Sequence, residues 1–492
     1  MKIFSKQYLP LGFILSLGIL SSALQAEPPN VLFIAVDDLR PEIKAFGATH
    51  MHTPNMDRLA NTGRPFTHHY VAVPTCGASR HALLTGKHPE SYTDTTNRAF
   101  SQFPDSLPSE PESFADLLRR NGWYTVSIGK VSHSDGYLWN DTSSLSEPAN
   151  RIEATQIECR YSWDEIVIGH NPSGFRHNPI FAYVDGETRD PGNSPAYEIG
   201  VDKLGHSVPD EAYPDGRIAQ DAVLKLEEFA ETDQRFFLAV GFYKPHLPFN
   251  APKKYWDLYD RKNLPEPDPK DTPTGADPET VEQSWEPHGN YYEQFEDGSP
   301  ASFEDDEYRK LLRHGYYASV SYADAQIGKV LDALEDTGLD ENTIVILWGD
   351  HGWCLNDYGL VGKHNILERG VHAPLIVRVP GQSQPGIPNK EIVGTVDIYP
   401  TIAEFCSLTP PDSVDGESLR QMIQDPNATG RGWAYSRQHM TLGQEAIRTE
   451  RWRLIRNDLN YDLYDLSTYP YELEDVSKRE EAIVEEIQTL IE

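Results

Sequence analysis

The chain has 492 residues, of which 38% are hydrophobic and 24% are charged, so it can bury a large core and form one large domain with a smaller one. Its formal net charge of −33 at pH 7 argues against nucleic acid and acidic membranes as partners recognised by bulk electrostatics. An anionic substrate would need a local cationic pocket and a metal ion to overcome the same repulsion.

Residues 1–26 have the pattern of a secretory signal peptide. Lys2 and Lys6 precede the apolar run Leu9–Leu20, which is too short to span a bilayer, and small residues follow it. We expect cleavage after Ala23 or Ala26 and a secreted or periplasmic mature protein, and an uncleaved anchor is the alternative. No later stretch is long and apolar enough to cross a membrane, so no membrane partner is expected.

Strand and helix patterns alternate along residues 27–415. Apolar runs that predict strands buried on both faces cover Asn30–Val36, Trp123–Ile128, Phe236–Phe242, Thr343–Trp348 and Leu375–Val379. Helices are predicted over Pro54–Gly63, Glu112–Asn121, Arg217–Glu231 and Tyr308–Thr337. This alternation indicates an α/β catalytic domain in which helices sandwich a large sheet, mostly parallel or mixed.

Polar side chains follow four of these strands directly. The pairs are Asp37 with Asp38, Lys130 with His133, Lys244 with His246, and Asp350 with His351. Ligands of open α/β sheets bind beyond the carboxyl ends of the strands, so the four pairs are expected to converge at one edge of the sheet. Carboxylates on two strand ends favour a Ca²⁺ or Mg²⁺ site over helix caps or turns.

Two regions lack clear periodicity. Residues 135–215 and 250–305 are rich in Pro, Gly, Asp and aromatic residues, and we interpret them as loops that shape a substrate entrance. Trp285, Tyr291 and Tyr292 could stack on sugar rings there, or they could pin a long loop by packing.

The pattern changes again towards the end of the chain. The segments Ala446–Ile455 and Tyr461–Leu466 read as short antiparallel strands, and Lys478–Ile491 as a terminal helix. We therefore predict a smaller α+β subdomain over residues 416–492.

The segment around Cys76 carries the most specific pattern. It reads Cys76-Gly77-Ala78-Ser79-Arg80 and closes with Leu84-Thr85-Gly86. Taken alone, a buried structural thiol explains Cys76 equally well. The segment resembles the signature of type I sulfatases, in which the cysteine is oxidised to formylglycine (3-oxoalanine). In that family the hydrated aldehyde carries two hydroxyls, of which one attacks sulfur and the other later expels sulfate.

Further motifs extend the resemblance over nearly the whole mature chain. They are Gly129-Lys130-Val131-Ser132-His133, Lys244-Pro245-His246-Leu247-Pro248-Phe249 and Asp350-His351-Gly352-Trp353. With them the chain resembles a type I sulfatase of the alkaline phosphatase superfamily, most similar to iduronate-2-sulfatases. The resemblance implies an alkaline-phosphatase-like fold and a sulfuric ester hydrolase that acts on sulfated carbohydrates.

The resemblance also implies roles for single residues. One calcium ion would be held by Asp37, Asp38, Asp350, His351 and the formylglycine at position 76. Arg80 and Lys130 would steady the aldehyde hydrate and the sulfate, and His133 would be the base that triggers sulfate release. Asp350 would also help to deprotonate the attacking hydroxyl. Sulfate binding and leaving-group assistance would come from His246 and Lys363, with Trp353 and His364 completing the substrate site.

The chain departs from the family pattern in two places. Ala78 stands where many members have proline, which is a familiar variant. Residues 354–359, Cys-Leu-Asn-Asp-Tyr-Gly, replace a His-Leu-Gly-Glu-His type segment of iduronate-2-sulfatases that is expected to border the sugar site. A 2-O-sulfated uronate and a sulfated uronate or galactose of an algal polysaccharide therefore both stay open as substrates.

Conversion of Cys76 would leave Cys159, Cys354 and Cys406, which can form at most one disulfide. Two other functions stay open: a phosphoesterase or phosphonate hydrolase of the same superfamily, and a non-catalytic glycan-binding protein. Lysines and histidines in place of further acidic ligands favour a single metal ion and thus the sulfatase. A formylglycine-generating or anaerobic sulfatase-maturating enzyme would be a partner, whereas the oligomeric state is left open.

Overall fold

The computed structural model describes residues 27–102, 108–133, 158–159, 161–167, 179–184, 189–438, 443–457 and 460–491. The predicted signal peptide and much of the first irregular region lie outside the described residues. Within the described ranges, none of the helices combines the length and the apolar composition that crossing a bilayer requires.

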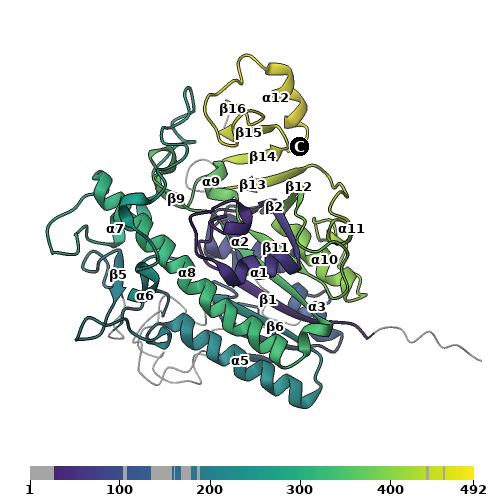
Figure 1. Ribbon diagram of the computed structural model, residues 1–492. Helices are drawn as coiled ribbons and strands as arrows, with labels where there is room; N and C mark the ends of the chain where they lie inside the picture. The colour runs from purple at the N-terminus through teal and green to yellow at the C-terminus, as the bar shows by residue number, and fades with distance from the viewer. Residues whose placement is uncertain are drawn as a thin grey trace, which may run out of the picture.

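The centre of the fold is a sheet with strand order β12-β2-β11-β8-β1-β6-β3-β4 (Figure 1). Its strands are β1 Asn30–Val36, β2 Arg64–Tyr70, β3 Tyr124–Gly129, β4 Glu165–Val167, β6 Phe236–Phe242, β8 Thr343–Gly349, β11 Leu375–Arg378 and β12 Asn389–Gly394. Strand β11 is antiparallel to both of its neighbours, and the other pairs are parallel. The predicted large, mostly parallel sheet is confirmed.

Helices cover both faces of this sheet (Figure 1). One face packs against α1 Pro54–Thr62, α5 Pro214–Thr232 and α8 Asp306–Asp336. The other packs against α2 Cys76–Thr85, α3 Phe114–Arg120, α10 Ile398–Phe405 and α11 Arg420–Gln424. The sequence of β1 is continuously apolar because its alternate side chains enter the two cores on opposite faces of the sheet.

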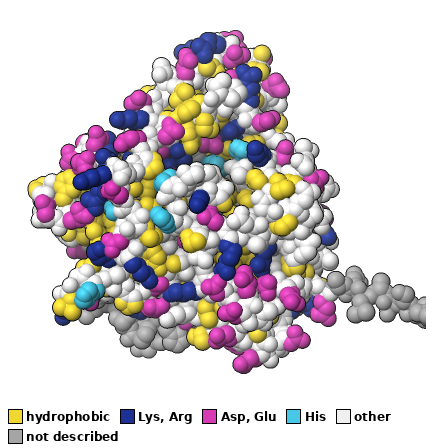
Figure 2. Space-filling model, viewed as in Figure 1, with side chains coloured by type: hydrophobic (Ala, Val, Ile, Leu, Met, Phe, Trp, Pro, Cys, Tyr) yellow, Lys and Arg dark blue, Asp and Glu magenta, His cyan; other side chains and the backbone are white. Residues whose placement is uncertain are grey.

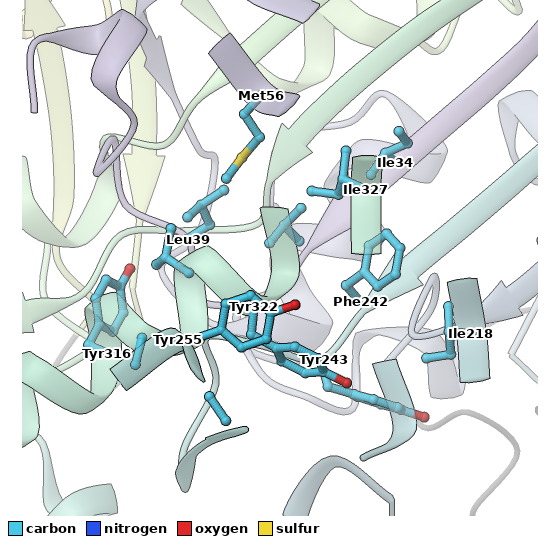
Figure 3. Close-up of a cluster of buried hydrophobic side chains, with 14 of the residues drawn as sticks. Ile34, Leu39, Met56, Ile218, Phe242, Tyr243, Tyr255, Tyr316, Tyr322 and Ile327 are labelled. Atoms are coloured by element: carbon cyan, nitrogen blue, oxygen red, sulfur yellow. The ribbon is translucent and has the colours of Figure 1, made fainter. Parts of the chain in front are cut away.

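The core between the sheet and helices α1, α5 and α8 is rich in tyrosine. Ile34 and Phe242 of the sheet lie among side chains of these helices such as Met56 and Ile327 (Figure 3). Tyr316 of α8 is fully buried, and its hydroxyl donates to the carbonyl oxygen of Asp38 at 2.7 Å. This core therefore supports the chain directly where it leaves β1.

The C-terminal part forms the predicted antiparallel sheet, seen at the top of Figure 1. It consists of β13 Trp433–Arg437, β14 Glu445–Thr449, β15 Trp452–Asn457 and β16 Asn460–Asp465, with α12 Glu481–Gln488 against it. The predicted segment Ala446–Ile455 is two strands, β14 and β15, joined at Glu450-Arg451. The side chains of α11 pack in the core of the large sheet, so the antiparallel sheet begins only at β13.

Shorter elements line the irregular regions. They are the parallel pair β5 Tyr197–Gly200 and β7 Phe249–Pro252, the hairpin β9 Cys354–Leu355 and β10 Val361–Gly362, and the short helices α6 Lys253–Trp256, α7 Trp285–Asn290 and α9 Glu368–Val371. On the face shown in Figure 2, acidic and basic side chains are interspersed over most of the surface.

Candidate active site

The four predicted polar clusters follow four adjacent strands, β8, β1, β6 and β3. The backbone N–H of Asp38 donates to Asp350 Oδ1 at 2.8 Å, which joins the ends of β1 and β8. Lys130 Nζ lies 2.6 Å from Asp37 Oδ2, and His246 Nε2 lies 4.0 Å from Asp38 Oδ2. The structure thus brings together Asp37, Asp38, Lys130, His246 and Asp350, whereas the ammonium group of Lys244 donates to the carbonyl oxygens of His246 at 2.9 Å and Pro248 at 2.6 Å and so fixes the loop that carries His246.

A close approach of two backbones directs Lys130 towards this site. A Cβ atom at Gly241 would lie 1.9 Å from the carbonyl oxygen of Lys130, so only glycine fits there. Gly129, immediately before Lys130, has φ of 70°, a left-handed conformation that glycine adopts without strain. The two glycines allow β3 to turn sharply at its end.

Cys76 is the first residue of α2, so it lies at the positive end of a helix dipole. Its Sγ atom lies 3.2 Å from His351 Nε2 and 3.2 Å from Lys363 Nζ. The next residue, Gly77, donates its N–H to Asn97 Oδ1 at 2.9 Å. The Cys76 side chain is buried, and this burial raises the pKa of the thiol well above its ordinary value.

Asp37 and Asp38 are fully buried but differ in charge environment. Burial alone raises the pKa of Asp37, but Lys130 and Arg80 hold it well below its usual value. Burial raises the pKa of Asp38 well above the ordinary value although Lys363 opposes the shift. Asp38 also has φ of 56°, a strained conformation for a residue other than glycine. Its carboxylate would gain from a further cation.

Arg80 binds two of the site carboxylates at once, those of Asp37 and Asp350. Its Nε donates to Asp350 Oδ2 at 3.0 Å and its Nη2 to Asp37 Oδ1 at 3.0 Å, while Nη1 reaches the carbonyl oxygen of Val131 at 3.2 Å. Burial and the neighbouring Asp37 raise the pKa of Asp350 to about 7, and Arg80 acts against this shift. The guanidinium therefore fixes the spacing of the acids.

The site histidines are held in defined orientations. Nδ1 of His351 lies 2.9 Å from the carbonyl oxygen of Gly352, and Nδ1 of His246 lies 2.6 Å from that of Leu247. In the neutral form each Nδ1–H donates to its carbonyl, which leaves the Nε2 lone pair facing the cluster. Burial lowers the pKa of His351, His246 and His133, so the neutral form dominates. His133 Nδ1 is buried without a hydrogen-bond partner among the described residues.

Lys363 and His364 enter the site from the strand β10. Lys363 Nζ lies 3.0 Å from Asp38 Oδ1 and 5.5 Å from the centre of the Trp353 ring. His364 Nδ1 lies 3.0 Å from Thr75 Oγ1, next to Cys76. Trp353 is fully buried beneath Lys363, so its contact with the site runs through that ammonium group.

The structure adds residues that the sequence did not single out. Glu286 of α7 lies 3.4 Å from His246 Nε2 and 3.3 Å from Lys363 Nζ. Asp215 accepts the N–H groups of Tyr243 and Lys244 at 2.9 Å each, and this fixes the loop that carries His246. Glu286 stands in an irregular region without periodicity, so no sequence signal marks it.

Residues 354–359 form β9 and the turn that precedes β10. Asp357 is buried and pairs with Arg40 at 2.6 Å, and the hydroxyl of Tyr358 donates to Glu472. The segment therefore supports the hairpin that carries Lys363. Tyr291 is also buried, whereas Tyr292 lines a groove with Tyr197 and Phe295. The side chain of Trp285 lies outside the described part of the structure.

The donors present fit a hard divalent cation. Oxygen atoms of Asp37 and Asp38 lie within 4.8 Å of ligand atoms of Cys76 and His246, and Asp350 and His351 form a second group with Cys76. The three buried carboxylates suit calcium or magnesium, whereas an imidazole nitrogen is a ligand more typical of transition metals. All four cysteines lie within the described ranges and are free, buried thiols.

Comparison with known proteins gives consistent results. Residues 29–407 match the family described as Sulfatase, and residues 356–492 match N-sulphoglucosamine sulphohydrolase, C-terminal. The iduronate 2-sulfatase of Homo sapiens is 30% identical over 413 residues, which are 78% of this chain and 70% of that protein.

Two solved structures share the fold. The phosphonate monoester hydrolase of Agrobacterium radiobacter superposes with a TM-score of 0.71 at 21% identity, covering 94% of each chain. A protein in complex with its substrate D-glucosamine-2-N,6-O-disulfate gives a TM-score of 0.68 at 22% identity, covering 94% of this chain and 98% of that one. At these identities the likeness concerns the fold alone, and it supports the predicted α/β architecture.

Proposed function

The chain belongs to the sulfatase family, and from this premise we propose that it is a secreted, calcium-dependent hydrolase of carbohydrate sulfate esters whose nucleophile is a formylglycine formed from Cys76. The family membership supports the sulfuric ester hydrolase. The modification, the ion, the location and the substrate are our inferences from the residues.

One observation carries the proposal. The first residue of α2, Cys76, places its Sγ within 3.2 Å of both His351 Nε2 and Lys363 Nζ, amid three buried aspartates. A structural thiol would need only an apolar pocket. Paired cations, carboxylates and neutral imidazoles around one sulfur atom are instead the surroundings of a reacting centre.

The position of each residue in the site suggests the role that it would take in catalysis. Arg80 and Lys130 are bound to Asp37, so they hold that carboxylate ionised and offset the charge of a bound sulfate. Lys363 and His246 approach from β10 and the loop after β6, where they would face the ester oxygen and one would protonate it. His133, with its buried and unpartnered Nδ1, is placed to take a proton when sulfate leaves.

Asp37, Asp38, Asp350 and His351 would hold one calcium ion together with the side chain at position 76. When bound, this ion would offset the negative charge of the acids and of the sulfate oxygens. Asp350 would help to deprotonate the attacking hydroxyl. Trp353 would contribute by holding Lys363 rather than by touching the sugar, and His364 would line the entrance.

The substrate class follows from the relatives. Resemblance to iduronate 2-sulfatase makes a 2-O-sulfated uronate one candidate, and other sulfated sugars, such as the galactose of an algal polysaccharide, are equally consistent with the site. A maturation enzyme that oxidises cysteine would act on the Cys76 segment, and the signal-like residues 1–26 would direct export.

Mass spectrometry of the peptide that contains Cys76, purified from a host with a maturation enzyme, tests the proposal first. We expect replacement of the thiol by an aldehyde, together with calcium-dependent release of sulfate from aryl and sugar sulfates. An unmodified thiol in active protein would exclude the formylglycine. Turnover of phosphate or phosphonate esters above that of sulfate esters would instead favour a phosphoesterase.

A further inference from the structure

Glu286 is an acidic residue of the site that none of the sequence motifs contains. Its Oε1 lies 3.4 Å from His246 Nε2, and its Oε2 lies 3.3 Å from Lys363 Nζ and 3.8 Å from His364 Nε2. His246 and Lys363 are the groups that would face the ester oxygen. Glu286 therefore lies on the side of the site where the sugar leaving group would sit, and not on the side where the sulfate group would be held.

The position of Glu286 is fixed by its own segment. The side-chain amide of Gln283 donates to the carbonyl oxygen of Val361 at 2.6 Å, and its oxygen accepts the N–H of Val361 at 3.3 Å. A Cβ atom at Gly362 would lie 2.9 Å from the Cβ of Ser284, so the two backbones are in close contact. These contacts join the start of α7 to the strand that carries Lys363.

Glu286 also differs from the other acids in exposure and in hydrogen bonding. Its side chain is 11% exposed, whereas those of Asp37 and Asp38 are 0% exposed, so it lies nearer to the entrance. Its Oε2 atom is buried and has Lys363 Nζ as an ion-pair partner at 3.3 Å, but it accepts no well-aligned hydrogen bond from the residues that the structure describes. A carboxylate only accepts hydrogen bonds, so the missing partner must be a donor.

We propose that Glu286 is a specificity-determining residue that accepts a hydrogen bond from a hydroxyl or amine next to the sulfated carbon of the sugar. The inference rests on the proposed function, because it uses His246 and Lys363 to locate the ester oxygen. It narrows the substrate to sugars with a free donor beside the sulfate ester. A second sulfate at that neighbouring position would be repelled by the carboxylate.

The test compares sugar sulfates with an aryl sulfate that has no sugar hydroxyl. Wild-type protein, Glu286→Ala and Glu286→Gln are assayed on 4-methylumbelliferyl sulfate, on monosulfates of galactose, glucose, glucosamine and a uronate, and on the deoxy and vicinal disulfate analogues of the best of these. Glu282→Gln, an exposed acid of the same segment, is the matched control. Circular dichroism and melting temperature establish that each variant is folded.

For Glu286→Ala we expect the ratio of kcat/KM on the best sugar monosulfate to kcat/KM on the aryl sulfate to fall roughly 10- to 100-fold, the value of one hydrogen bond to a charged group. The deoxy analogue should lose the same factor with the wild-type protein and nothing further with the variant. Glu286→Gln should raise turnover of the vicinal disulfate relative to the monosulfate, and Glu282→Gln should change neither ratio.

The possible failures are distinguishable. Equal losses on sugar and aryl sulfates in Glu286→Ala would make Glu286 a structural partner of Lys363 and overturn the inference. Wild-type activity on the aryl sulfate without activity on any sugar sulfate would overturn it as well and leave the sulfatase chemistry intact. Wild-type protein that carries formylglycine and cleaves none of these esters would refute the proposed function itself.

Discussion

Two clusters of buried charged side chains differ in how their charges are balanced. In the catalytic cluster, Asp37, Asp38 and Asp350 lie against Arg80, Lys130 and Lys363. The junction cluster lies between α9 and the C-terminal sheet and consists of Glu368, Glu472, Arg448 and Arg453 with two tyrosines. In the junction cluster two acids pair with two guanidinium groups, and every carboxylate oxygen accepts a hydrogen bond. The two oxygens of Glu368 accept from the Tyr70 hydroxyl and from Arg448 Nε, and those of Glu472 accept from the Tyr358 hydroxyl and from the backbone N–H of Glu368.

The catalytic cluster is not closed in this way. The pKa of Asp38 is raised by burial, His133 Nδ1 has no partner among the described residues, and Glu286 Oε2 likewise accepts no hydrogen bond from them. A closed network contributes to orientation and stability, whereas an open one leaves atoms for a ligand. The difference teaches that buried charge alone does not mark a site, because a cluster in which acids and guanidinium groups balance one another can serve the fold alone.

The largest effect should come from Cys76→Ala. Removal of the residue that forms the nucleophile should lower kcat/KM for any sulfate ester by about 10⁴-fold or more, while the free energy of unfolding changes little. Cys406→Ala removes another buried thiol far from the strand ends and serves as the control for thiol loss. Steady-state kinetics and urea unfolding provide the two readouts, and a loss in Cys76→Ala of much less than about 10⁴-fold would contradict the formylglycine mechanism.

The junction cluster should show the opposite behaviour. Glu368→Ala removes the carboxylate that pairs with both Arg448 and Arg453, and of the two guanidinium groups only that of Arg453 keeps another acidic partner, Glu472, so the change should destabilise the fold by about 3–5 kcal/mol. Activity at temperatures below the melting point should stay at the wild-type level, since the hydrogen bonds and ion pairs of Glu368 within the described ranges run to Tyr70, His372, Arg448, Arg453 and Glu472, all outside the catalytic cluster.

The control for that variant is Asp465→Ala, which removes an exposed pair with Arg451 in the same sheet and should cost about 1 kcal/mol or less. Chemical denaturation measures the stability of both variants. A stability loss in Glu368→Ala no larger than in Asp465→Ala would show that the junction cluster is not the closed network described here.

Most of the catalytic cluster could be predicted from the sequence because it follows a topological rule. Asp37, Lys130, His246 and Asp350 each come just after an apolar strand, and such strand ends meet at one edge. The strand β2 was missed because its sequence, Arg64 to Tyr70, is polar. His69 is buried there with ring nitrogens at 3.0 Å from the carbonyl oxygen of Ala373 and at 3.0 Å from Thr395 Oγ1, which only the folded chain provides.

Glu286 and the junction cluster could not be predicted, for a different reason. Glu286 lies in a loop that reaches the site through Gln283 and Val361, a contact that has no periodicity in the chain. Glu368 and Arg453 are 85 positions apart, and neither side chain interrupts the pattern of its element. Pairings of this kind depend on tertiary contacts and leave no local trace.

Removal of the metal ion should lower stability through the catalytic cluster alone. At a free calcium concentration 100 times its Kd, binding contributes about 2.7 kcal/mol to stability, so dialysis against a chelator should lower the melting temperature of the wild-type protein. Asp38→Asn should lose most of this response, and Glu368→Ala should keep it in full. Thermal unfolding with and without added calcium measures the response, and equal melting curves for the wild-type protein would exclude a bound ion of this affinity.

The smallest expected effect is a loss of folding stability at low pH. Burial alone raises the pKa of Glu368, but Arg448 and Arg453 hold it well below its ordinary value. Because the folded-state pKa is depressed, this group stabilises the protein above its unfolded-state pKa of about 4.3, and the contribution is lost as the pH falls towards the folded-state pKa. Burial raises the pKa of Glu472, so that group takes up its proton at a higher pH than Glu368 does in the folded protein.

Between about pH 4 and about pH 2.5 the wild-type protein should therefore lose about 2 kcal/mol more stability than Glu368→Gln, which has no carboxylate to protonate at this position. Urea unfolding at intervals across this range gives both slopes. Parallel slopes for the wild-type protein and Glu368→Gln would mean that the guanidinium groups do not hold the Glu368 carboxylate ionised, and the junction cluster would then be no more balanced than the catalytic one.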